Sequence, residues 1–176
     1  MNILFRYEKC ADFEFIFIKI TYELSSTKII LNSKFWQENV FSAYFSLNTI
    51  ELYDNCNLIV NNRVSINNSY GIGKKGYAVF IRGVNTNIYL NSDSQNYCAR
   101  GFLYSDKFDT NVVVNSGSYE TGGGKYAFNV KGRIKVNKGY VGSIKVLSNS
   151  LAVISGGVIG QDNELSASIP IECEDG

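Results

Sequence analysis

The sequence predicts an all-β solenoid, in which one chain winds into stacked turns of short parallel strands. The first observation behind this prediction is a recurring pattern of apolar residues closed by a polar stop, usually Asn. The pattern occurs five times, at Ile29–Asn32, Leu58–Asn61, Ile88–Asn91, Val112–Asn115 and Ile134–Asn137. The asparagines lie 29, 30, 24 and 22 positions apart. A strand-sized unit that recurs every ~20–30 residues is typical of stacked repeats.

A second repeat with a similar period supports the same prediction. Residues Tyr77–Gly83 align with Tyr126–Gly132, 49 positions later, and Gly101–Tyr104 falls between them. We expect one apolar residue from each segment to point inward and to stack on the next. These residues are Val79, Phe102 and Phe128, which are 23 and 26 positions apart.

Each turn of the coil is expected to contain three short strands. The clearest turn holds Ile50–Leu52, Leu58–Val60 and Val64–Ile66, each with apolar residues at every second position. A bend at Asn61–Arg63 separates the last two strands, and Asn tolerates the left-handed backbone that such bends need. The chain contains 16 Gly and one Pro, a composition that suits tight turns between strands whose N–H groups are all in ladders.

The two ends of the chain differ from the coil, which we place at residues 49–160. Residues 1–48 are predicted to form an N-terminal, β-rich cap within the same domain. This cap would hold a long alternating strand over Phe13–Leu24 and a short amphipathic helix over Ser33–Ser46. Residues 161–176 are polar and acidic, and they are expected to leave the coil as a tail.

Composition limits the function. The 176 residues carry a net charge of +1, so no overall charge favours nucleic acid or an anionic membrane. No apolar run approaches the ~20 residues of a membrane span. The first 22 residues lack the pattern of a signal peptide, which favours a cytoplasmic or virion location over secretion.

Metal, cofactor and redox chemistry have little support in the sequence. The chain has no His, which excludes His-based nucleophile systems and His-ligated zinc. The four cysteines show no C-x-x-C spacing, so we expect buried or solitary thiols rather than a disulfide or a metal site. These cysteines are Cys10, Cys56, Cys98 and Cys173. We therefore predict no cofactor and no metal.

With its Asn-Ser-Gly-x-Tyr stretch at Asn115–Tyr119, the region from about 50 to 160 resembles the pectate-lyase-like right-handed parallel β-helix superfamily, and especially its adhesin-like repeats. The resemblance implies a right-handed parallel β-helix. It also implies a ladder of stacked, hydrogen-bonded asparagines at one bend of successive turns. The matching positions are Asn61, Asn91, Asn115 and Asn137, and the ladder should end at Ser155.

The resemblance implies enzymes that cleave acidic polysaccharides: lyases of that superfamily use Asp or Glu around calcium with Arg or Lys as base, and its hydrolases use clustered Asp. The matching grouping here is Arg100 with Asp106 and Asp109. Because both aspartates fall in one expected bend beside Lys107, a solvated turn is the favoured interpretation. The G-x-G-x-x-G match at Gly71–Gly76 precedes a strand-like segment rather than a helix, so it is interpreted as a bend and not as a phosphate site.

Surface charge and aromatic residues supply the remaining binding candidates. Residues 121–160 hold six basic and no acidic residues, whereas residues 161–176 hold five acids and no base. The basic candidates are Lys131, Arg133, Lys135 and Lys145, and the aromatic ones are Tyr89 and Tyr119. A solvated surface, or pairing of the basic residues with the acidic tail, is the competing interpretation.

The favoured function is a non-enzymatic binding or scaffold protein that presents a rigid β-helix face to a macromolecular partner. Adhesin-like, virion-associated and enzyme-inhibitor roles all fit this class. The alternatives are a polysaccharide lyase or hydrolase, and a phosphate-polymer binder that uses the basic residues at 125–145. A protein or carbohydrate is the expected partner, with nucleic acid ranked below both and no membrane. A homo-oligomer is compatible with such a rod.

Overall fold

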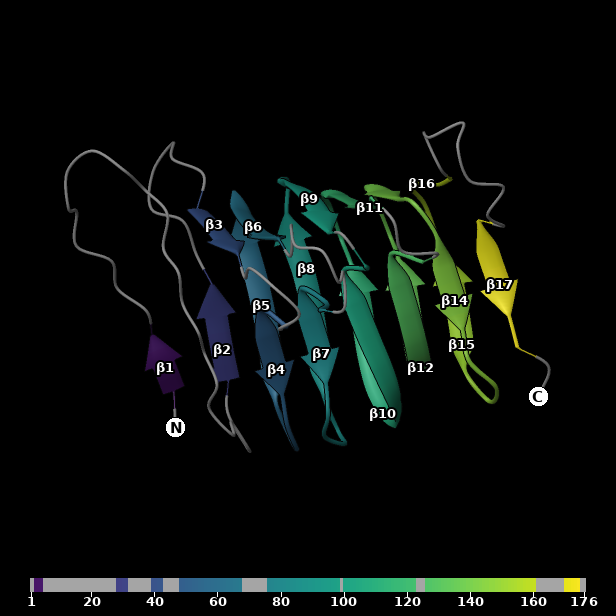
Figure 1. Cartoon of the computed structure of the whole chain (residues 1–176), viewed down its shortest axis with the longest axis horizontal. Coiled ribbons are helices and arrows are strands. Elements are labelled where there is room, and N and C mark those ends of the chain that lie inside the picture. Colours follow the sequence, from purple (N-terminus) through teal and green to yellow (C-terminus); the bar gives the residue numbers. More distant parts are fainter. Residues whose placement is uncertain are drawn as a thin grey trace.

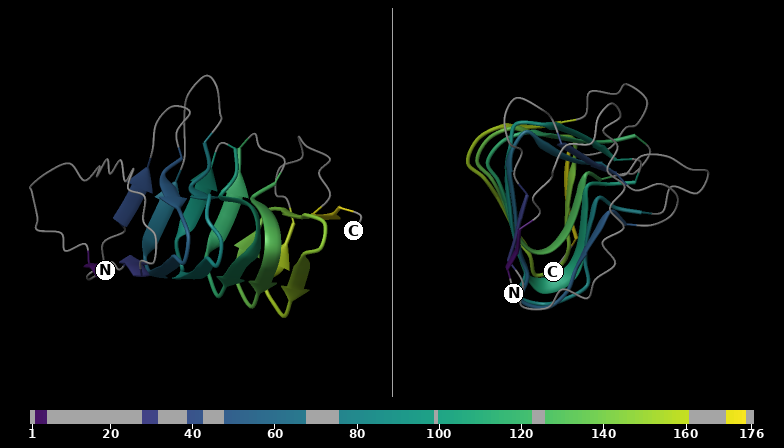
Figure 2. Two further views of the ribbon diagram at one scale, coloured as in Figure 1. Left: turned by 90° about the horizontal axis from the view of Figure 1, so that it is seen from below. Right: turned by 90° about the vertical axis from the view of Figure 1, so that its left-hand side faces the viewer.

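The computed structural model describes residues 2–4, 28–31, 39–42, 48–67, 76–98, 100–122, 126–160 and 170–174. Over these residues the protein is all-β, and its strand pairs are parallel. Figure 1 shows the strands side by side along the long axis, from β1 near the N-terminus to β17 near the C-terminus. The chain passes repeatedly around a common interior, so that successive turns overlie one another (Figure 2).

The strands form three faces around this interior. The first face contains β4 (Ile50–Leu52), β7 (Val79–Ile81), the start of β10 (Leu103–Val114), the start of β12 (Phe128–Val136), β14 (Ile144–Val146) and β17 (Ile171–Cys173). The second contains β1 (Asn2–Leu4), β2 (Lys28–Leu31), β5 (Asn57–Asn62), β8 (Asn87–Ser92), the ends of β10 and β12, and β15 (Leu151–Ile154). The third contains β3 (Asn39–Ser42), β6 (Val64–Asn67), β9 (Gln95–Cys98), β11 (Ser118–Thr121), β13 (Tyr140–Val141) and β16 (Val158–Ile159).

The predicted stacking of like residues is confirmed on the second face. Val114 pairs in register with Leu90 on one side and with Val136 on the other. All three side chains are 0% exposed, so they form one inward column. Ile134 pairs with Ala152, which extends the period by a turn of 18 residues. Burying such columns is the main favourable contribution to folding.

One inward position on the first face differs from the prediction. Val79 and Phe128 both pair with Leu103, not with Phe102. Phe102 precedes the strand and points into the interior from the corner. Its ring lies 4.6 Å from the Tyr119 ring and 5.5 Å from the Phe128 ring, measured between centroids.

Asn and Gly shape the corners between faces. Asn55, Asn62, Asn85 and Asn149 have positive φ values between 53° and 60°, a region that Asn tolerates. At the corner between the second and third faces, Gly117, Gly139 and Gly157 recur with positive φ. A Cβ on Gly139 would lie 2.5 Å from the carbonyl oxygen of Gly117. The turns approach too closely there for any side chain.

The two ends of the chain depart from the sequence prediction. Asn39–Ser42 is a strand that pairs with β6, so the helix expected over 33–46 is wrong at these residues, because the parallel ladder overrides the local pattern. Ile171–Cys173 pairs with β14, which places this part of the acidic tail in the coil. The strand expected over 13–24 and the Gly71–Gly76 bend lie outside the described residues, apart from Gly76. No helix in the described part of the chain could cross a membrane.

Candidate functional site

The outward side of the second face is the candidate functional site. Side chains alternate along each of its strands, so every second residue points away from the core; the pattern in β8 runs from half-buried to buried three times. We call the outward side chains of β5, β8, β10, β12 and β15 on this face the outer face. They form three parallel columns: Asn57, Asn87, Asn111, Arg133 and Leu151; Ile59, Tyr89, Val113, Lys135 and Val153; and Asn61, Asn91, Asn115, Asn137 and Ser155.

The predicted asparagine ladder is confirmed in the third of these columns. Each side-chain Nδ2 donates to the Oδ1 of the Asn one turn earlier. The distances are 2.9 Å from Asn91 to Asn61, 2.7 Å from Asn115 to Asn91 and 2.8 Å from Asn137 to Asn115. Ser155 follows in this column, so the amide ladder stops where the sequence said it would.

A second ladder in the first column was missed by the sequence analysis. Asn87 donates to Asn57 at 3.1 Å and Asn111 donates to Asn87 at 3.3 Å. The signal was present, because each of these residues precedes a residue of the predicted ladder by four positions. An Asn at both ends of the same short strand places both on the same side of the sheet.

The ladders leave hydrogen-bonding capacity directed away from the core. An amide side chain offers two N–H donors and two lone pairs on its oxygen. The ladder uses one donor and one lone pair of Asn91 and of Asn115. The remaining groups recur every ~4.8 Å along the axis, the spacing between neighbouring strands.

Tyr89 and two of the predicted cations share this surface. Tyr89 is half-buried and points outward, as predicted, between Ile59 and Val113 in its column. Lys135 follows Val113 in the same column, and Arg133 follows Asn111 in the next. The three columns of the outer face contain two cations and no carboxylate among the described residues, so the surface is locally positive.

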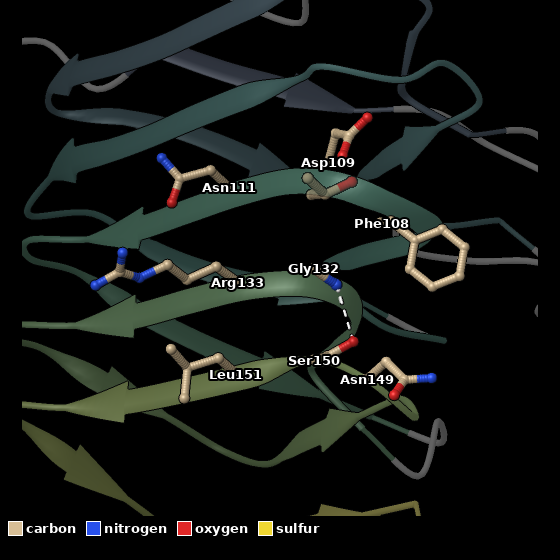
Figure 3. Close-up of a pocket in the computed structure, with 9 residues that line it drawn as sticks. Phe108, Asp109, Asn111, Gly132, Arg133, Asn149, Ser150 and Leu151 are labelled. Carbon is tan, nitrogen blue, oxygen red and sulfur yellow. Dashed lines mark hydrogen bonds between the residues drawn. The ribbon is translucent and has the colours of Figure 1, made fainter. Parts of the chain in front are cut away.

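An open depression of about 530 Å³ lies where the outer face meets the corner toward the first face (Figure 3). It is lined by three successive turns, with Asp109 and Asn111 from β10, Arg133 from β12, and Ser150 and Leu151 from the next turn. Figure 3 shows the amide oxygen of Asn111 on the side nearer Arg133, and the N–H of Gly132 donating to Ser150 Oγ at 2.9 Å.

A bulge in β10 forms the upper wall of the depression. Ser105 pairs with Val130 and Thr110 with Gly132, so four residues of β10 bulge out opposite one residue of β12. The buried hydroxyls of Ser105 and Thr110 lie 2.5 Å apart and close the neck of the bulge.

The three catalytic candidates, which are Arg100, Asp106 and Asp109, each have different neighbours. Asp109 lines the depression, whereas Asp106 forms an ion pair with Lys107 at 3.2 Å. The guanidinium of Arg100 lies 4.8 Å above the Tyr77 ring. Among the residues described as lining the depression, Asp109 is the one carboxylate, whereas glycoside hydrolysis uses a pair.

Two of the basic candidates are held by other side chains. The Lys131 ammonium lies 3.9 Å above the ring of the exposed Phe108, beside the depression. Lys145 belongs to the first face, where its Nζ lies 2.6 Å from Glu174 and 3.4 Å from Glu172. The hydrogen bond to Glu174 raises the pKa of Lys145. The competing interpretation, pairing with the acidic tail, is therefore correct for Lys145.

Tyr119 is not a surface residue. It is 1% exposed, and its ring packs edge-on against Phe102 and Phe128. Burial raises the pKa of its hydroxyl. The alternation in β11 explains this placement, since Ser118 and Glu120 take the outward positions.

An aromatic stack on the first face was not among the candidates predicted from the sequence. Phe80 and Tyr104 point outward and stack at 5.0 Å with planes inclined by 20°. The guanidinium of Arg82 lies 4.7 Å from the Phe80 centroid, and it also bonds Glu51. Because protein groups occupy these ring faces, the stack is structural and offers no platform to a ligand.

In comparisons with known proteins, no family model, no curated protein and no solved structure matches the chain. The case for the outer face therefore rests on the residues described above. Of the six binding candidates from the sequence, the outer face contains Tyr89, Arg133 and Lys135, and Lys131 lies at its border.

Proposed function

We propose that the chain is a right-handed parallel β-helix of the pectate-lyase-like kind, and that it acts as a non-enzymatic binding module. The parallel register of the strand pairs and the asparagine ladder support this assignment. Right-handedness is supported by the strong preference of parallel strand connections for that hand.

The proposed binding surface is the outer face, and the observation that carries the proposal is its row of equally spaced asparagines beside Tyr89, Arg133 and Lys135. Hydrogen-bonding groups that recur at a fixed interval suit a linear polymer, because the chemical groups of a polymer also recur along its length. Adhesin-like, virion-associated and inhibitor roles remain compatible with such a surface.

The chemistry of the outer face favours an acidic polysaccharide as the ligand. The outward amide groups of Asn91 and Asn115 can bond sugar hydroxyls. The Arg133 guanidinium can bind a carboxylate through two parallel hydrogen bonds, and Tyr89 supplies a large apolar contact next to them. Lys135, one turn beyond Val113, adds a second positive charge.

The test is binding of the full chain to immobilised polygalacturonate, alginate and hyaluronate, followed by calorimetry on any polymer retained. We expect Arg133→Ser to weaken binding by about tenfold, or ~1.4 kcal/mol, and Tyr89→Ala by a similar factor. Binding should weaken as salt rises, because screening reduces the attraction of exposed charges. Phe80→Ala on the first face is the matched control for Tyr89→Ala and should bind as the wild type does.

The same experiment separates the alternatives. Unsaturated sugar products that appear with the wild type and vanish with Asp109→Ala would establish a lyase. This second candidate is favoured because Asp109 and Arg133 line the same depression. Retention on polyphosphate but on none of the sugars would establish a phosphate-polymer binder. The proposal fails if the acidic sugars are not bound, or if Arg133→Ser and Tyr89→Ala both bind as the wild type does.

A further inference from the structure

The depression at the edge of the outer face contains one charged side chain of each sign, and neither is paired within the protein. Arg133 and Asp109 both line the depression, and both are exposed. Among the described residues, neither side chain has an ion-pair or hydrogen-bond partner. Arg82 on the first face differs, because Glu51 holds its guanidinium. The two charges in the depression are therefore available to a ligand.

The cations closest to Asp109 along the chain and on the next strand are engaged by other groups. Lys107, in the same bulge, pairs with Asp106 at 3.2 Å. Lys131, on β12, holds its ammonium 3.9 Å above the Phe108 ring. The carboxylate of Asp109 therefore keeps an uncompensated negative charge at the wall of the depression.

The two free charges belong to neighbouring turns of the coil. Asp109 directly precedes Thr110, which pairs with Gly132, and Arg133 pairs with Asn111. Their strands are ~4.8 Å apart along the axis. Figure 3 shows the Asp109 carboxylate and the Arg133 guanidinium directed away from each other. A sugar unit of an extended polysaccharide is comparable in length to this strand spacing, so a polymer that runs along the axis presents successive units to the two charges.

Each charge places a different requirement on the ligand. The Arg133 guanidinium can bind a carboxylate through two parallel hydrogen bonds. An ionised Asp109 can only accept hydrogen bonds, which sugar hydroxyls and amide N–H groups donate. A second carboxylate beside Asp109 would be repelled, and like-charge contacts of this kind reject wrong partners. The depression thus attracts one acidic unit and disfavours another acidic unit next to it.

We propose that the depression makes the outer face selective for polysaccharides in which an acidic sugar alternates with a neutral one, over polymers of uronic acid alone. Arg133 binds the carboxylate of the acidic unit, whereas Asp109 accepts a hydrogen bond from the neutral unit and determines the specificity. Phe108 and Leu151, which are 60% and 52% exposed at the depression, offer apolar contact to an acetamido methyl group on that unit. This inference rests on the proposed binding of acidic polysaccharides by the outer face, and it names their class.

The test compares hyaluronate, in which uronic acid alternates with N-acetylglucosamine, with polygalacturonate, in which every unit is acidic. Calorimetry uses the full chain and fragments of equal length at one ionic strength. We expect the wild type to bind hyaluronate about tenfold more tightly. This order opposes general electrostatics, because polygalacturonate carries more carboxylates per sugar and would be favoured by the cations of the outer face alone.

Two variants that each remove one negative charge from the bulge assign the selectivity to a residue. Asp109→Asn keeps the shape and a hydrogen-bond acceptor but removes the charge, so it should raise the affinity for polygalacturonate about tenfold and leave that for hyaluronate nearly unchanged. Asp106→Asn is the matched control, since Asp106 pairs with Lys107 and does not line the depression. It should keep the wild-type preference.

The outcomes separate this inference from the function on which it rests. If the wild type binds both polymers equally, or prefers the one in which every unit is acidic, the selectivity is overturned while the binding of acidic polysaccharides stands. The same conclusion follows if Asp109→Asn retains the preference, or if Asp106→Asn abolishes it to the same extent. If no acidic polysaccharide is bound, both proposals fail together.

Discussion

At the scale of single residues, asparagine has two separate roles in this protein. At Asn62 and Asn85 it supplies a left-handed corner, whereas at Asn91 it links three turns through side-chain hydrogen bonds. Asn91 donates to Asn61 and accepts from Asn115. Asn137, at the end of the ladder, donates only to Asn115.

The position of an Asn in the ladder should determine the cost of removing it. Asn91→Ala breaks two hydrogen bonds and leaves a half-buried amide on each side without its partner, so we expect a loss of about 1–3 kcal/mol in the free energy of unfolding. Asn137→Ala should cost about half as much, because one bond is lost. Urea unfolding measures both, and equal losses would contradict a continuous ladder.

Glycine has a position-specific role at Gly132, where β12 bends between two faces. Its φ is +117°, and a Cβ there would lie 2.3 Å from the carbonyl oxygen of Thr110. We expect Gly132→Ala to destabilise the fold by about 1–3 kcal/mol. Gly160→Ala is the control, since a Cβ there meets no atom within 4 Å. Thermal unfolding should separate the two variants, and similar melting temperatures would refute the argument.

At the scale of strands, the sequence predicted the elements best where alternation and a closing Asn coincide. This holds for β5, β8 and the ends of β10 and β12, which carry both inward apolar columns and the predicted ladder. The closing Asn fixes the phase of each strand, because a polar residue that points outward places the residue before it inward, as at Leu90, Val114 and Val136.

The prediction failed where the alternation could not be assigned a starting phase. Tyr119 is the one apolar residue of the short strand Ser118–Thr121, so no alternation along that strand indicated that its side chain points inward. The depression was also beyond prediction, because it joins residues of three turns around a bulge whose length only the register reveals.

An ion pair between neighbouring strands gives an element-scale prediction about pH. Arg82 on the turn of β7 bonds Glu51 of β4 through two contacts, at 2.6 and 3.1 Å. The hydrogen bond from Arg82 lowers the pKa of Glu51 below its usual 4.5. The stabilisation is therefore present above the unfolded-state pKa and is lost as pH falls through the folded-state value.

We expect the wild type to lose slightly more stability than Glu51→Gln between about pH 6 and pH 3. The difference should stay below about 1 kcal/mol, because Arg82 is largely exposed and water screens the pair. Melting temperatures of both proteins across this range measure the effect. Parallel pH profiles would show that the pair contributes nothing to holding β4 against β7.

At the scale of the whole molecule, stability should vary along the axis of the rod. Each turn contacts only its neighbours. The stability of a turn is therefore approximately the sum of its intrinsic folding free energy and the free energies of its two interfaces. The turn that contains β8 has neighbours on both sides. In contrast, β15 and β16 each have a neighbouring strand on one side within the described residues.

Hydrogen exchange at low protein concentration should follow this gradient. Amides in β8 and in the second half of β10 are expected to exchange only through opening that approaches global unfolding, whereas those of β15 and β16 should exchange through local opening of much lower free energy. The buried column supports this order, because its exposure rises from 0% at Val136 to 40% at Ile154. Uniform protection from β8 to β16 would contradict it, and would mean that the chain opens as a single cooperative unit rather than turn by turn.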